Sequence, residues 1–79
     1  MLKTIIKFEK EIAFLCGDEE FSIIPNSEYE IKETKIKGYE GWVIICGLFR
    51  LIKKSGYCGS ALSFSPFEYD NLLKKYKSN

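Results

Sequence analysis

The chain has 79 residues, of which 46% are hydrophobic and 15% aromatic, and its formal net charge is +1 at pH 7. This length allows one domain, residues 1–79, with a single thin core, and the apolar content excludes an intrinsically disordered chain. The near-neutral charge disfavours a generic nucleic-acid binder, since such proteins are usually basic overall.

The sequence lacks the patterns of targeting and membrane segments. Lysines interrupt the first eight residues, MLKTIIKF, so no apolar stretch is long enough for the core of a signal peptide. The longest apolar run, Trp42 to Phe49, is far shorter than the roughly 18 residues that a membrane-spanning helix needs. We therefore expect a cytoplasmic protein without membrane contact, located in the host cytoplasm if a phage encodes it.

The cysteines predict neither a disulfide framework nor a metal site. Cys16, Cys46 and Cys58 form an odd number without CxxC spacing, which favours reduced thiols. Three thiols and no histidine cannot complete a four-ligand zinc site within one chain. We expect no cofactor and no metal.

Alternation of apolar and polar residues predicts half-buried strands in the first part of the chain. Ile6 and Phe8 begin the pattern, and Ile12, Phe14 and Cys16 resume it. The expected strands are residues 6–8, 12–16 and 21–24, separated by a bend near residues 9–10 and ended by turns over 17–20 and 25–27.

The next strand contains a change of phase. Tyr29 and Ile31 alternate with charged neighbours, whereas Ile36 lies an odd number of residues beyond Ile31. A bulge or bend near residues 33–34 would return Ile36 to the buried face of the sheet. We therefore predict a bulge or bend at that point.

The most apolar stretch, residues 42–46, follows a glycine-bounded turn and is expected to form the central strand. Gly47 interrupts this strand and predicts a bulge or a sharp corner. Gly56 and Gly59 are expected to serve the backbone geometry of the following hairpin. That hairpin comprises residues 48–52, a turn over 53–56 and a last strand that ends at residue 64.

The C-terminal segment changes to the helical period. Ser65, Pro66 and Glu68 combine an N-cap serine, a proline at the first helical position and a glutamate three residues after the cap. Apolar residues spaced i, i+3, i+4 and i+7 give the helix one face that packs on the sheet, and lysines near its end complement the helix dipole. The apolar face consists of Tyr69, Leu72, Leu73 and Tyr76, and the lysines are Lys74, Lys75 and Lys77.

Together these elements predict an α+β protein that is mostly β. We expect a small twisted barrel or a highly curved antiparallel sheet of about five to six strands, with one C-terminal helix over about residues 66–76.

Cys58 invites an enzymatic interpretation. The run Cys58-Gly59-Ser60 resembles the sequence around the nucleophile of papain-like proteases, but the position of that family's nucleophile is Ala61. The chain also has no histidine to act as the base. We therefore expect no enzyme, and a small-molecule binder or enzyme that uses Cys58, with Lys53 or Lys54 favouring its thiolate, is the second alternative.

A phosphate-binding loop is also disfavoured. Residues 53–56, Lys-Lys-Ser-Gly, lack the GxxxxGK[ST] frame and lie between two predicted strands. A turn with solvated lysines is the expected structure.

Two sets of surface residues are candidates for partner binding. Residues 1–34 hold four lysines and eight carboxylates, whereas residues 35–79 hold eight basic residues and three carboxylates, so the two halves can attract each other or form two faces. Aromatic and basic residues on loops suit a protein interface, and also base stacking with phosphate neutralisation. The aromatic-basic candidates are Tyr39, Trp42, Arg50, Lys53, Lys54 and Tyr57, and the acidic candidates are Asp18, Glu19, Glu20, Glu28, Glu30 and Glu33.

The pattern over residues 20–76 resembles the small SH3-like barrels of bacteriophage and mobile-element proteins. It consists of the strand opening at residues 27–31, the glycine turns, the apolar strand at residues 42–46 and the terminal element at residues 65–76. The resemblance implies a non-enzymatic adaptor or an inhibitor that occupies a host protein.

These observations lead to one main hypothesis and one alternative. We expect a protein-binding module, of the kind a phage encodes to inhibit a bacterial defence or nucleic-acid enzyme by occlusion, as anti-CRISPR proteins do. In that case the acidic residues could enter a basic nucleic-acid channel. The alternative is a small barrel that binds nucleic acid through the aromatic-basic residues and the helix lysines. A homodimer is also open, because an exposed strand edge can pair with a second copy.

Overall fold

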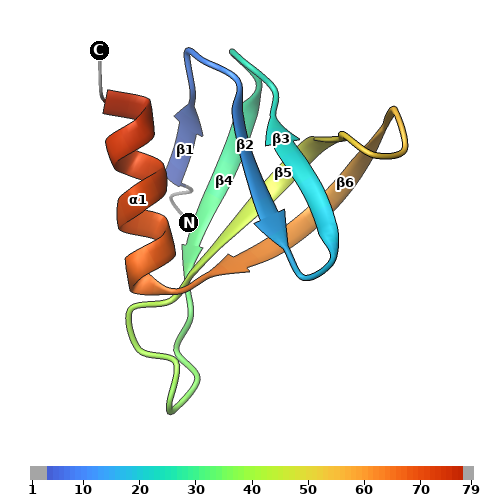
Figure 1. The fold of residues 1–79 in the computed structure, drawn as a ribbon. Helices are drawn as coiled ribbons and strands as arrows, with labels where there is room; N and C mark the ends of the chain where they lie inside the picture. Colours follow the sequence, from blue (N-terminus) through green and yellow to red (C-terminus); the bar gives the residue numbers. More distant parts are fainter. Residues whose placement is uncertain (1–3, 78–79) are drawn as a thin grey trace.

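The computed structural model describes residues 4–77, with side chains up to residue 75, so the side chains of Tyr76 and Lys77 lie outside the described residues. Six strands and a C-terminal helix follow one another along the chain (Figure 1). They are β1 (Thr4–Lys7), β2 (Ile12–Cys16), β3 (Glu19–Ile23), β4 (Glu28–Glu33), β5 (Val43–Leu51), β6 (Gly56–Phe64) and α1 (Pro66–Lys77). The predicted class, mostly β with one C-terminal helix, is confirmed.

All strands belong to one antiparallel sheet, in which β5 pairs with three other strands, β3, β4 and β6. β6 pairs with β5 along all nine residues of both strands. On its other edge β5 changes partner, because residues 43–46 pair with β4 and residues 49–51 pair with β3. β1 extends the sheet beyond β4, and β2 extends it beyond β3.

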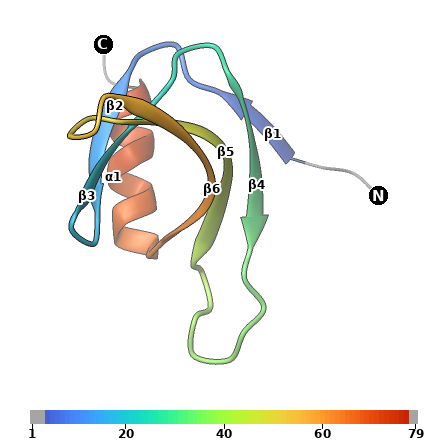
Figure 2. The same cartoon turned by 90° about the vertical axis from the view of Figure 1, so that its right-hand side faces the viewer.

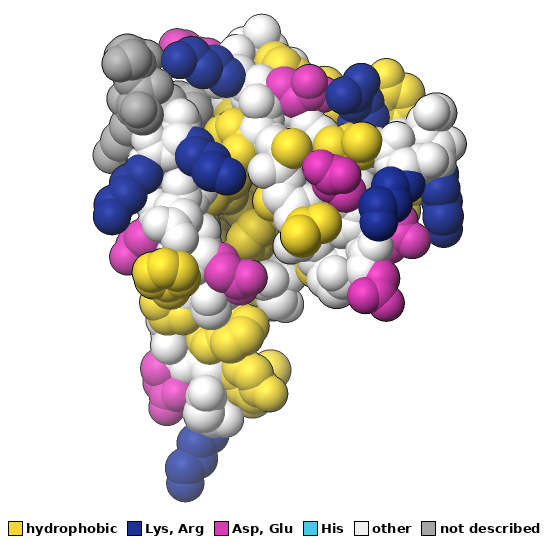
Figure 3. Space-filling view, viewed as in Figure 1, with side chains coloured by type: hydrophobic (Ala, Val, Ile, Leu, Met, Phe, Trp, Pro, Cys, Tyr) yellow, Lys and Arg dark blue, Asp and Glu magenta, His cyan; other side chains and the backbone are white. Residues whose placement is uncertain are grey.

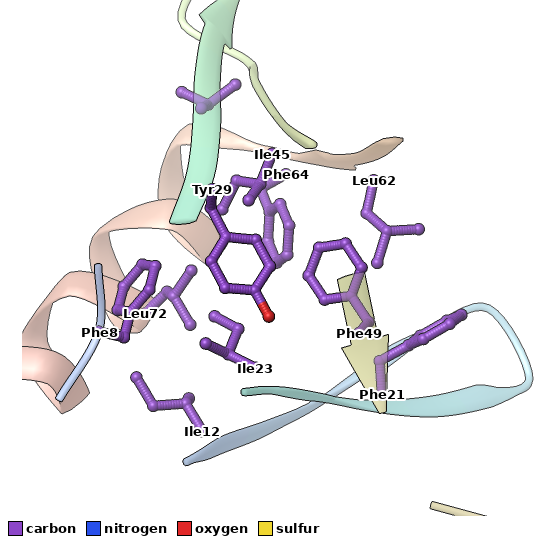
Figure 4. Close-up of a cluster of buried hydrophobic side chains, with 11 residues drawn as sticks. Phe8, Ile12, Phe21, Ile23, Tyr29, Ile45, Phe49, Leu62, Phe64 and Leu72 are labelled. Carbon is purple, nitrogen blue, oxygen red and sulfur yellow. The ribbon is translucent and has the colours of Figure 1, made fainter. Parts of the chain in front are cut away.

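The sheet is strongly curved, and α1 contacts both β2 and β6, two strands that do not pair with each other (Figure 2). The core lies on the concave side, where Phe8, Ile23, Tyr29, Ile45 and Phe49 are fully buried (Figure 4). The helix contributes the buried Leu72 to this core. The sheet therefore wraps the core, and α1 covers part of its open side.

The Tyr29 side chain fills the position where β5 changes its pairing from β4 to β3 and forms hydrogen bonds with the backbone there. Its ring lies among the core side chains, and its hydroxyl group accepts a hydrogen bond from the backbone N–H of Ile24 at 2.9 Å and donates one to the carbonyl of Leu48. Leu48 belongs to the short part of β5 that pairs with neither β4 nor β3. The tyrosine hydroxyl thus satisfies two backbone groups that the strand ladders leave unpaired.

Neither predicted bulge is present in the sheet. β4 ends at Glu33 without a bulge, and Ile36 is 64% exposed in the loop that follows. β5 passes through Gly47 in unbroken register with β6, so this glycine marks the change of partner and not a bulge. In the β5–β6 hairpin neither Gly56 nor Gly59 has a positive φ, and Ser55 takes the left-handed conformation with φ 51°.

The capping box predicted for α1 is confirmed by reciprocal hydrogen bonds. The Glu68 N–H donates to Ser65 Oγ at 3.2 Å, and the Ser65 N–H donates to Glu68 Oε1 at 3.0 Å. In the part of the chain that the structure describes, no helix has the length and apolar character needed to cross a membrane.

Candidate protein-binding surface

The β4–β5 loop, residues 34–42, has a defined internal structure. The Trp42 N–H donates to the carbonyl of Tyr39 at 3.1 Å, and Thr34 Oγ1 donates to the same carbonyl at 2.6 Å. The Thr34 N–H donates to the carbonyl of Trp42 at 3.1 Å and joins the two ends of the loop. Gly38 and Gly41 have φ of 93° and 85°, values that favour glycine at both turns.

The aromatic side chains of this loop contact each other. The Tyr39 and Trp42 rings lie edge to face, with centroids 5.3 Å apart and planes at 79°. Tyr39 is 49% exposed, and Trp42 is half-buried. The pair therefore presents an aromatic surface to solvent, and the contact between the rings restrains both side chains.

The loop packs against the start of α1. A Cβ atom added to Gly41 would lie 3.1 Å from Pro66 Cγ, so the backbone of the loop lies directly on the proline ring. The next helix residue, Phe67, is 74% exposed. The contact brings two segments that are distant in the sequence onto one end of the molecule.

Hydrophobic side chains gather over the start of α1 and the adjoining loop (Figure 3). We call this surface the loop patch. Its members are Ile36, Tyr39, Trp42, Pro66 and Phe67. Exposed charged residues surround it on the loop, namely Lys35, Lys37 and Glu40. An exposed apolar patch with aromatic members and a polar rim is typical of protein-protein interfaces.

The structure divides the predicted aromatic-basic set into two groups. Tyr39 and Trp42 lie before the first residue of β5, whereas the other four residues lie at the opposite end of that strand, around the β5–β6 turn. A nine-residue strand spans about 30 Å, so the two groups do not form one surface. The second group comprises Arg50, Lys53, Lys54 and Tyr57.

Two members of this second group form ion pairs with the acidic half of the chain. Arg50 Nη2 lies 3.0 Å from Glu11 Oε2, and Lys54 Nζ lies 3.3 Å from Glu19 Oε1. The opposite charges of the two halves therefore attract each other within the fold. Tyr57 is 66% exposed beside this network.

The acidic candidates are distributed over two separate elements. Asp18, Glu19 and Glu20 lie at the β2–β3 hairpin, whereas Glu28, Glu30 and Glu33 lie on β4. Each group also has lysine partners, with Glu19 next to Lys54, Glu28 4.0 Å from Lys7 and Glu30 4.0 Å from Lys32. The structure does not gather the six carboxylates into one acidic face.

Cys58 is half-buried on β6, opposite Phe49 of β5. Its thiol lies 3.6 Å from the carbonyl oxygen of Gly59, the next residue. Lys54, one of the two lysines expected to favour the thiolate, is engaged with Glu19. Within the described residues, no group of three or more cysteine and carboxylate side chains is arranged to hold a metal ion.

Sequence reasoning missed Ile36, Pro66 and Phe67 as surface residues. The phase of the apolar pattern predicts a buried Ile36, and the sequence identifies Pro66 only as the start of a helix. One feature of the sequence indicates that Phe67 is exposed. It precedes the apolar helical series Tyr69, Leu72 and Leu73 and does not belong to it.

No protein family, no curated protein and no solved structure matches this chain. The resemblance to phage-type SH3-like barrels and the cytoplasmic location therefore stay predictions.

Proposed function

We propose that the chain is a non-enzymatic protein-binding module whose partner docks on the loop patch. The observation that carries this proposal is the concentration of exposed large apolar side chains at one end of the molecule, with exposures of 64% for Ile36, 49% for Tyr39 and 74% for Phe67. Aromatic residues in the centre of such a patch supply most of the binding energy in protein complexes.

The order of the loop supports the same proposal. The hydrogen bonds at Thr34 and the packing of Gly41 on Pro66 fix the positions of Tyr39 and Trp42 before any partner arrives. A surface that is already ordered loses less conformational entropy on binding. Little of the favourable free energy of apolar contact is then offset by the cost of ordering the loop.

Occlusion is the mode of action that this arrangement favours. The module would cover part of its partner's surface without reacting with it, and the narrower proposal is that this partner is a bacterial defence or nucleic-acid enzyme. Direct nucleic-acid binding has less support, because Arg50 and Lys54 are ion-paired and lie far along β5 from Tyr39 and Trp42.

Affinity purification with quantitative mass spectrometry tests the proposal. The bait is the tagged chain, used in nuclease-treated lysate of the organism in which it acts. The double variant Ile36→Ser, Phe67→Ser should lower recovery of a stoichiometric protein partner at least about tenfold, since loss of two anchors is worth more than about 1.4 kcal/mol.

The matched control is Tyr57→Ser, which removes a similarly exposed aromatic side chain on β6, opposite Arg50 near the other end of β5. It should leave recovery unchanged. Equal recovery with the double variant, or loss of recovery with the control alone, would place the interface elsewhere. A partner that is recovered from untreated lysate but not from nuclease-treated lysate would favour the nucleic-acid alternative.

A further inference from the structure

A groove of about 370 Å³ lies between the outer edge of β2 and α1. Four consecutive residues of β2, Ile12 to Leu15, line it. Successive side chains of a strand point to opposite faces of the sheet, so four residues in a row can line a groove only along the strand edge. The groove therefore follows the backbone of β2.

This edge has backbone groups without a strand partner. Among residues 4–77, β2 pairs with β3 alone. Cys16 and Glu19 flank a two-residue turn. The residues that close such a hairpin form a hydrogen-bonded pair, so alternation along the ladder directs the peptide groups of Ala13 and Leu15 outward. In the same part of the chain, neither residue makes a backbone hydrogen bond outside its strand ladder.

β2 lacks two of the features that often protect an edge strand, charged residues and proline. Its sequence, IAFLC, contains no charged residue and no proline. An extended chain lying along this edge would supply the alternating donors and acceptors that Ala13 and Leu15 lack. The chemistry of the edge therefore selects an extended polypeptide.

The side of the groove that faces the helix is apolar. Phe14 packs against Phe64 with ring centroids 5.1 Å apart, and the buried Leu72 of α1 lies on the same side. A side chain directly opposite Phe14 on an added strand would contact these three residues. An apolar residue is therefore favoured at that position.

Charged residues mark the two ends of the groove. Glu20, which pairs with Leu15, and Glu68 in the first turn of α1 line one end. α1 runs in the direction opposite to β2 (Figure 1), so Lys75 near the end of the helix lines the groove toward Ile12. The groove is acidic at one end and basic at the other.

We propose that this groove binds an extended segment of another protein, added to β2 as an antiparallel strand. All pairs in the sheet are antiparallel. An antiparallel ligand places its N-terminal side near Glu20 and Glu68 and its C-terminal side near Lys75. The ligand carries a basic residue at the first position, an apolar residue over Phe14 and an acidic residue at the last position.

The spacing of the charges fixes the ligand pattern. Glu68 and Lys75 are separated by about 10 Å along the helix axis. The first and fifth residues of an extended strand lie about 13 Å apart, and flexible side chains can bridge the difference from about 10 Å. The predicted pattern is Lys-x-apolar-x-Glu, in which all three named residues face α1. This groove shares no residue with the loop patch, so the inference does not depend on the proposed function.

The test uses two capped peptides of identical composition, Thr-Lys-Thr-Val-Thr-Glu-Thr and Thr-Glu-Thr-Val-Thr-Lys-Thr. Each is titrated into the ¹⁵N-labelled chain and followed by NMR. The first peptide should shift the amides of Ala13 and Leu15, slow their hydrogen exchange and bind roughly threefold to tenfold more tightly than the second, as expected for exposed ion pairs.

Two pairs of variants separate the contributions of charge and backbone. Lys75→Glu should lower the preference for the first peptide to about twofold or less, whereas Lys74→Glu, a change at an exposed neighbour that does not line the groove, should retain it. Leu15→Pro removes an outward N–H and should weaken both peptides at least about fivefold, while Leu15→Ala keeps that N–H and should not. If Leu15→Pro fails to fold, the comparison of Lys75→Glu with Lys74→Glu still tests the proposal.

Equal affinity for the two peptides, or shifts confined to residues outside the groove, would overturn the proposal. Absence of binding at millimolar peptide would overturn it as well. Concentration-dependent self-association that protects Ala13 and Leu15 would identify a second copy of the chain as the occupant, and would equally overturn it.

Discussion

The ring of Tyr29 occupies the space where a side chain at position 47 would lie. A Cβ atom added to Gly47 would be 2.5 Å from Tyr29 Cδ1 and 2.9 Å from Cε1. The ring therefore packs directly on the backbone of β5. This close approach allows the tyrosine hydroxyl to reach Leu48 and Ile24 where β5 changes partner.

Replacement of Gly47 by alanine should destabilise the protein by about 1–3 kcal/mol, because the added methyl group displaces a buried ring. Chemical denaturation followed by circular dichroism measures the change. Gly59→Ala is the matched control in the neighbouring strand, since a Cβ there has no heavy atom within 4 Å. It should change stability by less than about 1 kcal/mol. Equal effects at the two glycines would contradict the close packing described for Tyr29.

Removal of the Tyr29 hydroxyl should leave the ring in place and two backbone groups without their partner. We expect Tyr29→Phe to cost about 1–3 kcal/mol of unfolding free energy, the usual penalty for buried unsatisfied polar groups. The exposed Tyr57→Phe should have almost no effect. Unchanged stability in Tyr29→Phe would mean that water satisfies Ile24 and Leu48 equally well.

The fold should lose stability at alkaline pH. Burial raises the pKa of Tyr29 above 10.0, with a smaller opposing effect from the hydrogen bond with Ile24, and burial together with the charges of Asp70 and Glu33 raises the pKa of Tyr69. A raised folded-state pKa means that stability is fully present below pH 10 and declines as pH rises through the folded-state value.

Urea unfolding between about pH 8 and pH 11 measures this dependence. Tyr29→Phe starts from a lower stability and should lose less of it over that range than the wild type does. The difference between the two curves isolates Tyr29, because the contribution of Tyr69 is common to both. Parallel curves would show that Tyr29 titrates alike in the folded and unfolded chain.

The capping box should contribute measurably to the stability of α1. Ser65→Ala removes the acceptor for the Glu68 N–H and should cost about 1 kcal/mol. Ser63→Ala, at an exposed strand position two residues earlier, is the control. Hydrogen exchange of the first helical amides should increase in the Ser65 variant alone. Equal hydrogen-exchange rates of these amides in the two variants would contradict a stabilising role of the capping box.

Local chemistry made part of the fold predictable from the sequence. Ser65, Pro66 and Glu68 act within one helical turn, so their order alone located the start of α1. The change of partner along β5 depends on strands distant in the sequence, so a glycine within the strand pattern does not distinguish it from a bulge or a sharp corner. The phase of the apolar pattern places Ile36 on the buried face, whereas the side chain is exposed.

The candidate site was only half predictable for a similar reason. Residue type and loop position identify Tyr39 and Trp42 as candidates, and the structure places their rings in contact. Arg50 and Tyr57 are near them in sequence, but the length of β5 separates them in space. Phe67 joins the patch because Gly41 packs on Pro66, a tertiary contact that no local pattern encodes.

Site-specific photo-cross-linking tests the central claim, that a protein partner docks on the loop patch, most directly. p-Benzoylphenylalanine is placed at Tyr39, Phe67 or Tyr57, one at a time, and the chain is irradiated in the cells in which it acts. The account predicts that the first two positions yield an adduct with the same protein, and that position 57 does not. An adduct formed from Tyr57 alone, or different proteins captured from Tyr39 and Phe67, would contradict it.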